Sequence, residues 1–214
     1  MIHLAAIRRT ARQSAGQHGD PLCQGVGVTT RPWPLRVGPL LLRDASEPDI
    51  EPLLAFRNDP AVQRFLIATT VDPEKFRRDW LAKPSSTTDF SCVAEADGQV
   101  VAIGFLEVVD AMGQPGVPKG TDGLIGYIVD PRAAGRGYAT HLAKGLLTAA
   151  FGHLGLRRVT AGCYADNAAS ARVLEKAGMR REQHGIEDSW HAELGWVDGY
   201  TYAILEREWR AAHE

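Results

Sequence analysis

The stretch Pro131-Arg132-Ala133-Ala134-Gly135-Arg136-Gly137-Tyr138-Ala139 follows a strand-like run, Leu124 to Val129. After it, apolar side chains recur at steps of three and four from Ala139 to Leu154, which predicts one continuous helix. Two glycines one residue apart let the backbone turn sharply and approach a ligand without an intervening Cβ. Free N–H groups at a helix N-terminus favour phosphate, and Arg132 and Arg136 add cationic donors. The pattern therefore predicts a strand–loop–helix unit that binds a phosphate group.

Two familiar phosphate loops do not fit this stretch. A Walker loop requires Gly-Lys followed by Ser or Thr, whereas Gly137 is followed by Tyr138 and Ala139. A dinucleotide fingerprint requires Gly or Ala three residues after its second glycine, and Thr140 stands there. Taken alone, the motif is also compatible with an ordinary loop that contains two glycines.

The remaining patterns predict a mixed α/β domain from residue 35 onward. Helix-capping signals occur at Ser46 and Asp72, and Asp97-Gly98 marks a hairpin turn between two strand-like runs. Residues 110–122 are rich in glycine and proline and predict a long exposed loop. The other expected elements are strands at 35–43, 90–95, 100–109 and 157–164, strands near 179–187 and 200–206, and a short helix at 167–177.

Residues 1–34 are predicted to form an extension outside the folded domain, which would occupy 35–214. The extension lacks the apolar periodicity of a helix or a strand, and Pro32 and Pro34 separate it from the first strand. We therefore expect a poorly packed segment, or one ordered only by a partner surface.

Composition excludes several function classes. The formal net charge is −2 and the pI about 6.4, so no broad attraction to nucleic acid or to an acidic membrane is expected. No apolar run approaches the ~18 residues of a membrane span. Three widely spaced cysteines without a CxxC pair favour a reducing, cytoplasmic location. The seven histidines show no metal-ligand spacing and no GxSxG elbow occurs, so neither a metal site nor a hydrolase triad is expected.

Two motifs together point to a known family. The run Arg132-x-x-Gly135-x-Gly137-Tyr138-Ala139 resembles the acetyl-CoA loop Q/R-x-x-G-x-G/A of GNAT acyltransferases. Further along, NAASARVLEKAGM at 167–179 resembles that superfamily's N-x-x-S-x-x-x-x-E-K-x-G-F block. The opening LLLR at 40–43 with RNDP at 57–60, and the ending DGY-x-Y at 198–202, resemble the RimJ/RimL-type branch. That branch acetylates protein N-terminal amines and a range of small amines.

The resemblance implies a fold and a co-substrate. The fold is a mixed, mostly antiparallel, twisted sheet of about seven strands with about four flanking helices, whose splayed central strands hold acyl-CoA. Loop amides would bind the pyrophosphate of acetyl-CoA, Ile128 and Val129 would pair with the pantetheine arm, and Asn167 would contact that arm or its water. The full set implied in binding is Ile128, Val129, Arg132, Gly135, Arg136, Gly137, Tyr138, Ala139 and Asn167.

Acetyl transfer to an amine requires an acid and a base. By the resemblance, Ser170 would lie near the thioester sulfur and protonate the leaving thiolate, directly or through water. A serine placed early in a helix for capping is the plain alternative. The preferred base, by its spacing after Ser170, is Glu187 or Asp188, and the further candidates are Glu107, Glu182, His191 and Glu193, each of which can instead be a solvated surface residue.

The implied function is transfer of an acetyl group from acetyl-CoA to a primary amine by direct attack in a ternary complex. The alternative is a catalytically silent acyl-CoA-binding sensor or interaction module. Whether the amine belongs to a peptide N-terminus or to a small molecule stays open. Four aromatic side chains are expected either to line an acceptor groove or to pack in the core or at a homodimer contact. They are Trp80, Trp190, Trp196 and Tyr200.

Overall fold

A computed structural model of the chain describes residues 31–67, 69 and 71–213. Eight strands form one sheet in the order β1-β2-β3-β4-β5-β6-β8-β7, and all neighbours are antiparallel except the parallel pair β5 and β6. The strands are β1 (Leu35–Val37), β2 (Leu40–Arg43), β3 (Cys92–Ala96), β4 (Gln99–Val109), β5 (Asp122–Val129), β6 (Arg158–Tyr164), β7 (Arg180–His191) and β8 (Gly195–Leu205).

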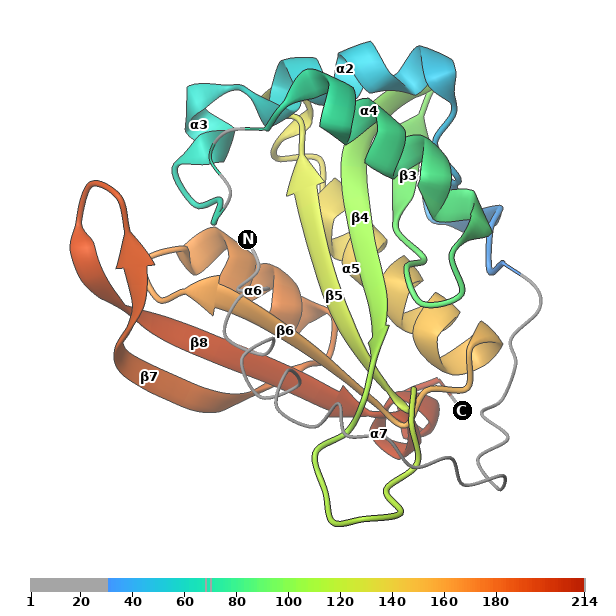
Figure 1. The fold of residues 1–214 in the computed structure, drawn as a ribbon, viewed down its shortest axis with the longest axis vertical. Helices are drawn as coiled ribbons and strands as arrows, with labels where there is room; N and C mark the ends of the chain where they lie inside the picture. The colour runs from blue at the N-terminus through green and yellow to red at the C-terminus, as the bar shows by residue number, and fades with distance from the viewer. Residues whose placement is uncertain (1–30, 68, 70, 214) are drawn as a thin grey trace.

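Helices cover both faces of this sheet, with α2, α3 and α4 above and in front of it and α5 behind it in Figure 1. The α-helices are α2 (Ile50–Arg57), α3 (Pro60–Gln63), α4 (Pro73–Ala82), α5 (Tyr138–Thr148), α6 (Ala168–Lys176) and α7 (Glu206–Ala211). Short helical turns occupy Glu47–Asp49, Lys83–Ser85 and Pro131–Ala133, and a π-helical turn, Ala149–His153, extends α5. Across the described part of the chain, no helix is long and apolar enough to cross a membrane.

The predicted fold class is confirmed, with eight strands in place of about seven. The additional strand arises because the run 35–43 is a hairpin and not one strand. Val37 pairs with Leu40, and Gly38 in the turn between them has a φ of +55°, a left-handed conformation that glycine adopts at little cost. Because apolar residues stand on both sides of this turn, hydrophobic periodicity alone did not indicate it.

The last hairpin is longer than predicted and projects from the body of the molecule (Figure 1). Its strands were expected near 179–187 and 200–206, but β7 continues to His191 and β8 begins at Gly195. Trp190 and Trp196 are cross-strand partners near the tip, with ring centroids 5.4 Å apart in an edge-to-face arrangement. Such aromatic pairs stabilise an antiparallel ladder, which explains why pairing extends so far.

The sheet is buried on both faces around β4 and β5. On one face, Leu142 and Leu146 of α5 are fully buried against the strands. On the other, Leu53 of α2 and Trp80 of α4 pack with Ile103 of β4. Because both faces are covered by apolar side chains, β5 is held rigidly along its length, and its direction determines where the loop after it lies.

Residues 31–34, which the sequence places in the extension, contact the domain. Trp33 is only 8% exposed, and its indole Nε1 donates a 3.1 Å hydrogen bond to the carbonyl of Phe90. Arg31 donates to the carbonyl of Lys83 at 2.9 Å and pairs with Asp44 at 2.5 Å. These contacts join the segment to the edge of the sheet. The rest of the expected extension, 1–30, lies outside the described residues.

Candidate functional site

The two central parallel strands separate part-way along their length. Asp122, Gly123 and Leu124 of β5 pair with Arg158, Val159 and Thr160 of β6, and the pairing stops there. Beyond this point β5 continues upward while β6 turns away, which leaves a wedge between them in Figure 1. The backbone groups that β5 directs toward β6 in the segment 125–129 are therefore not used in the β5–β6 ladder. This splay, expected from the family resemblance, is the geometric centre of the candidate site.

The glycine-containing loop lies at the upper end of β5, next to the open end of the splay. Gly135 and Gly137 have φ values of +78° and +77°, and a Cβ added to either would meet nothing within 4 Å. Gly137 is the residue that precedes α5, and its carbonyl accepts hydrogen bonds from Thr140 and His141. The first N–H groups of a helix lack partners within the helix and point along its axis. The loop thus exposes backbone N–H groups at the start of α5, and no side chain at Gly135 or Gly137 blocks access to them.

Arg132 does not extend freely from this loop. Its guanidinium Nη2 lies 2.6 Å from Oδ2 of Asp130, and its backbone nitrogen donates to Oδ1 of the same residue at 2.9 Å. The hydrogen bonds from Arg132 lower the pKa of Asp130, so the pair stays charged. Arg132 therefore holds the turn that starts the loop, and its charge is largely balanced by Asp130. Arg136 is exposed on the loop.

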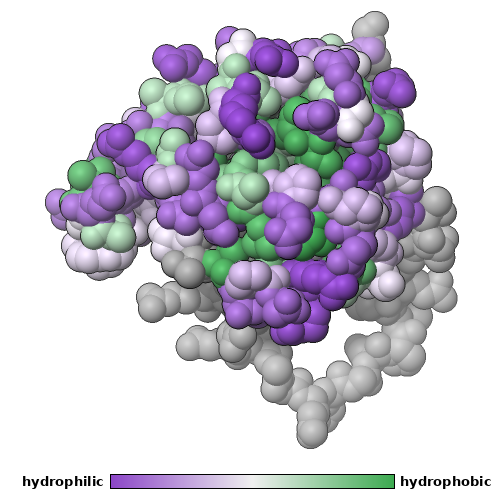
Figure 2. Space-filling model, turned by 90° about the horizontal axis from the view of Figure 1, so that it is seen from above, coloured by the Kyte–Doolittle hydropathy of each residue, from purple (hydrophilic) through white to green (hydrophobic). Residues whose placement is uncertain are grey.

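The sheet end that carries this loop is seen in Figure 2. Apolar side chains are exposed across the middle of this face, and hydrophilic side chains surround them.

Asn167 and Ser170 begin α6, beside the splay. The side-chain Oδ1 of Asn167 accepts a 3.1 Å hydrogen bond from the backbone nitrogen of Ser170, so Asn167 is the N-cap of the helix. Ser170 is buried, and its Oγ lies 3.0 Å from the hydroxyl of Tyr127 on the splayed part of β5. A hydrogen bond from Ser170 also reaches the thiol of Cys163 on β6. Ser170 thus joins both strands of the splay.

The groups around Ser170 stay neutral at ordinary pH. Burial raises the pKa of Tyr127 well above its usual value, and this outweighs the opposite effect of the Ser170 hydrogen bond. Burial likewise raises the pKa of the Cys163 thiol. The site therefore brings a neutral hydroxyl and a neutral thiol next to Ser170. The sequence did not single out Tyr127, because a tyrosine in an apolar strand is usually a core residue.

The opposite face of β6 carries an aromatic cluster. The hydroxyl of Tyr164 donates a 3.1 Å hydrogen bond to the carbonyl of Trp190, and its ring meets those of His191 and Phe65 at centroid distances of 5.6 and 6.4 Å. This cluster connects the splay, the last hairpin and the segment after α3. It faces away from Ser170, because Cys163, which neighbours Tyr164, points toward α6.

His191 is an unsuitable base. Its Nδ1 accepts hydrogen bonds from the backbone nitrogens of Glu193 and Leu194 at 3.1 and 3.3 Å, which leaves the proton on Nε2. That Nε2 lies 2.7 Å from the carbonyl of Arg64 and donates to it. Both ring nitrogens are engaged in holding the hairpin turn against the segment after α3. His191 is a structural residue of the site.

Glu187 and Asp188, the two preferred bases, lie in a bulge of β7 between Gly185 and Ser189. Glu187 has a φ of +48°, is exposed, and its backbone nitrogen donates to Oδ1 of Asp198 at 2.9 Å. The carboxylate of Asp188 instead lies over Gly185 and Gly199 and accepts a 2.6 Å hydrogen bond from Ser189. The bulge therefore lays the carboxylate of Asp188 over two glycines of the last hairpin.

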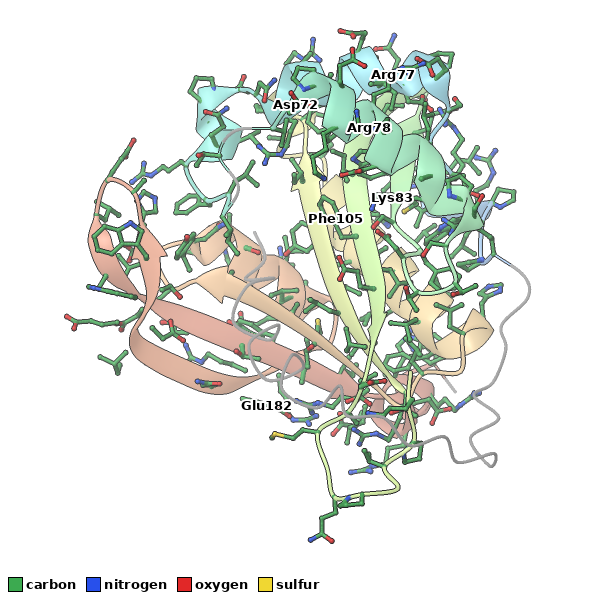
Figure 3. All side chains as sticks on the ribbon, in the orientation of Figure 1. Asp72, Arg77, Arg78, Lys83, Phe105 and Glu182 are labelled. Carbon is green, nitrogen blue, oxygen red and sulfur yellow. The ribbon has the colours of Figure 1, made fainter. Side chains whose placement is uncertain are left out.

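The remaining acidic candidates lie elsewhere. Glu182 forms ion pairs with Arg158 and with Arg180, the latter at 2.5 Å. Hydrogen bonds from these two residues lower the pKa of Glu182, and the bond from Arg158 has the larger effect. Figure 3 shows Glu182 near the lower part of the sheet, away from the upper end of β5. Glu107 pairs with Leu124, where β5 and β6 are still joined. Glu193 lies in the hairpin turn between β7 and β8.

A glycine-rich loop at a helix N-terminus, next to two parallel strands that splay apart, is the arrangement that the family resemblance predicts. A family model for the acetyltransferase (GNAT) domain matches residues 39–180. The chain belongs to the GNAT acetyltransferase family. The match spans the sheet from the first hairpin through α6 and so includes the whole splay.

Individual relatives agree with this assignment. The chain is 39% identical over 85 residues to the uncharacterized N-acetyltransferase YnaD of Bacillus subtilis (strain 168), a match that covers 40% of this chain and 49% of that protein. The alignment thus spans about half of that relative's length. Two solved structures have the same fold. A spermidine N-acetyltransferase from Vibrio cholerae, solved with CoA and spermine, has a TM-score of 0.70 at 16% identity, covering 80% of this chain and 98% of that one.

The second solved structure is RimL, a ribosomal L7/L12 alpha-N-protein acetyltransferase in complex with CoA. Its TM-score is 0.66 at 19% identity, and the match covers 78% of this chain and 94% of RimL. At such identities the likeness shows the fold. The expected similarity to RimJ/RimL-type proteins is confirmed at that level.

Proposed function

We propose that this protein is an acyl-CoA-dependent N-acetyltransferase that transfers an acetyl group from acetyl-CoA to a primary amine. The observation that carries the proposal is the splay between β5 and β6, which opens directly onto the glycine loop at the N-terminus of α5. A splay alone would offer unpaired backbone groups, and a loop alone would offer a phosphate site. Together they match a ligand with a pyrophosphate at one end and an amide-containing arm at the other.

The loop suits the pyrophosphate of CoA in shape and charge. Both glycines leave open space where a side chain would stand, so a phosphate oxygen can approach the backbone closely. The N–H groups of Arg136, Gly137, Tyr138 and Ala139 would donate to it at the positive end of the α5 dipole. Arg132 would act mainly by holding the turn through Asp130.

The splayed segment suits the arm of CoA. Ile128 and Val129 have backbone groups that β6 does not use, and an extended amide-containing chain can pair with them as an added strand would. One of these amides would also donate to the thioester carbonyl and stabilise the oxyanion that develops there. Asn167 would contribute by fixing the first turn of α6, which sets the position of Ser170.

The chemistry follows from the two faces of the splay. A neutral amine attacks the thioester carbon, a C–N bond forms, and the C–S bond breaks with the electron pair going to sulfur. The nitrogen loses one proton and the sulfur gains one, so the two transfers balance. We assign proton removal to Asp188, directly or through water, since its carboxylate shares a sheet face with Tyr164. We assign proton donation toward sulfur to Ser170, which regains a proton from water while the proton taken by Asp188 passes to solvent.

The acceptor belongs to the class of primary amines. RimL is described as acting on a protein N-terminus, and the Vibrio cholerae enzyme was solved with spermine, which is a small polyamine. In this chain the aromatic cluster of Phe65, Tyr164 and His191 lies on the face that Asp188 shares. That cluster favours an amine with an apolar or aromatic neighbour, such as a peptide N-terminus, over a bare polycation.

The test is release of free thiol from acetyl-CoA in the presence of a panel of peptides and small amines. We expect amine-dependent release, with mass spectrometry showing one added acetyl group on the acceptor. A folded protein that binds acetyl-CoA in calorimetry but releases no thiol with any amine would establish the binding-module alternative. A protein that binds no CoA would remove the proposal altogether.

A further inference from the structure

Tyr127 contacts Ser170 through two different atoms. Its hydroxyl lies 3.0 Å from the Oγ of Ser170 and 3.2 Å from the backbone carbonyl oxygen of the same residue. Tyr127 comes from the splayed part of β5 and Ser170 from the first turn of α6, so this pair connects the strand to the helix across the core. Both residues are buried, at 7% and 5% exposure.

A tyrosine hydroxyl carries a single hydrogen, so it cannot donate to both of these oxygens at once. When Tyr127 donates to the carbonyl, its oxygen accepts a hydrogen bond from Ser170, whose hydrogen then points toward Tyr127. When Tyr127 donates to Oγ, the hydrogen of Ser170 is directed elsewhere. The two arrangements differ only by rotation of two hydroxyl hydrogens.

Burial keeps Tyr127 in the protonated form that this exchange requires. The apolar surroundings raise its pKa, so the phenol remains a hydrogen-bond donor throughout the neutral range. A further neighbour of Ser170 is Cys163, whose thiol is buried and also held neutral. Tyr127 is thus a neutral hydrogen-bond donor within reach of the Ser170 hydroxyl.

We propose that Tyr127 is a positioning residue for acetyl transfer. Its hydroxyl donates a hydrogen bond to Oγ of Ser170 while the C–S bond breaks, and this directs the hydrogen of Ser170 toward the leaving sulfur. This inference rests on the role given to Ser170 in the proposed function. No proton leaves Tyr127, and the proton balance between amine and sulfur is unchanged. Tyr127 acts only through Ser170, so its effect must vanish when Ser170 is replaced.

The test is a double-mutant cycle with Tyr127→Phe and Ser170→Ala. We expect Tyr127→Phe to lower kcat about 10-fold, as the loss of one hydrogen bond to a reacting group implies, with KM for acetyl-CoA within about twofold. Ser170→Ala should lower kcat by roughly 10²–10⁴-fold. The double variant should match Ser170→Ala. A structural role would instead make the two losses multiply, and that result would overturn the inference.

Tyr202→Phe is the matched control. Tyr202 is also buried against α6, and its hydroxyl bonds to Glu175 at 3.0 Å, outside the Ser170 pair. Its loss should affect stability but leave kcat within about twofold. If Ser170→Ala lowers kcat and Tyr127→Phe does not, this inference fails while the proposed function stands. A Ser170→Ala enzyme with wild-type kcat would remove the role of Ser170 and this inference together.

A second variant covers the case in which Tyr127→Phe does not fold. Replacing Tyr127 with 3-fluorotyrosine keeps the packing and the hydroxyl but makes the phenol a better donor. We expect kcat to rise severalfold in the Ser170 protein and to stay unchanged in the Ser170→Ala protein. An unchanged kcat in both proteins, or an equal change in both, would contradict the proposal.

Discussion

The carboxylate of Asp188 lies directly against the backbone of Gly199, where an added Cβ would stand 2.5 Å from Oδ1. Gly199 is the antiparallel partner of Tyr164 at the end of β6. Cross-strand partners project to the same face of a sheet, so Asp188 and the ring of Tyr164 share one face. Glu187 and Asp188 are both exposed, and this contact with Gly199 is what distinguishes the carboxylate of Asp188.

Asp188→Asn should therefore lower kcat by roughly 10²–10⁴-fold, because the amide cannot take a proton from the attacking amine. Glu187→Gln is the matched control, with the same change of charge one residue earlier, and should keep kcat within twofold. Gly199→Ala should also lower kcat, since its methyl group displaces the carboxylate without changing its charge. Steady-state kinetics with a saturating acceptor measures all three. Wild-type kcat in Asp188→Asn would show that the proton passes to water.

Gly137→Asp should abolish CoA binding. The change places a side chain and a negative charge in the open space over the loop backbone. We expect the Kd measured by calorimetry to rise at least about 100-fold, which corresponds to roughly 3 kcal/mol. Gly155→Asp is the control, because Gly155 has a φ of +63° and similarly open surroundings but lies in the turn before β6. Retained micromolar affinity in a folded Gly137→Asp protein would refute the pyrophosphate assignment.

Removal of residues 1–34 should destabilise the domain, whereas removal of 1–30 should not. The longer deletion eliminates the buried indole of Trp33 and its hydrogen bond to Phe90. Loss of a buried tryptophan costs about 3–5 kcal/mol, which lowers Tm by about 10 °C in a domain of this size. Thermal unfolding of both truncated proteins beside the full chain provides the measurement. Equal Tm values for the two truncations would support a domain boundary at residue 35.

The stability of the protein should fall in acid partly through Asp49. Burial alone would raise the pKa of Asp49, but hydrogen bonds from Arg43 and Ser46 outweigh it and bring the pKa to about 2, from 3.8. Because the folded value is the lower one, this carboxylate stabilises the fold above about pH 4. That contribution, about 2 kcal/mol at most, is lost as the pH falls toward 2.

Urea titrations between pH 7 and pH 2 measure this effect. Asp49→Asn should be less stable than the wild type at pH 7 and should approach it near pH 2, where the wild-type carboxyl is about half protonated in the folded state and almost fully protonated in the unfolded state. Its free energy of unfolding should vary less steeply with pH. A constant difference between the two proteins over the whole range would contradict the assignment.

The glycine loop, α5 and α6 were predictable because their signals are local. Left-handed positions at Gly135 and Gly137, a stripe of apolar residues along α5 and an Asn167 cap all depend on neighbours within a few residues. Turn chemistry and helical periodicity report such short-range preferences directly. The motif spacing then led to the family, which the family model confirms.

The sequence determined the class of the fold and the loop expected to bind phosphate, and it favoured two adjacent acids, Glu187 and Asp188, among several candidate bases. Only the tertiary structure brought Tyr127 to Ser170, placed Asp188 over Gly199, engaged both nitrogens of His191 and packed Trp33 onto Phe90. Each of these contacts joins residues far apart in the chain or depends on the bulge in β7. Such contacts are selected by the packing of the whole sheet, and no local preference encodes them.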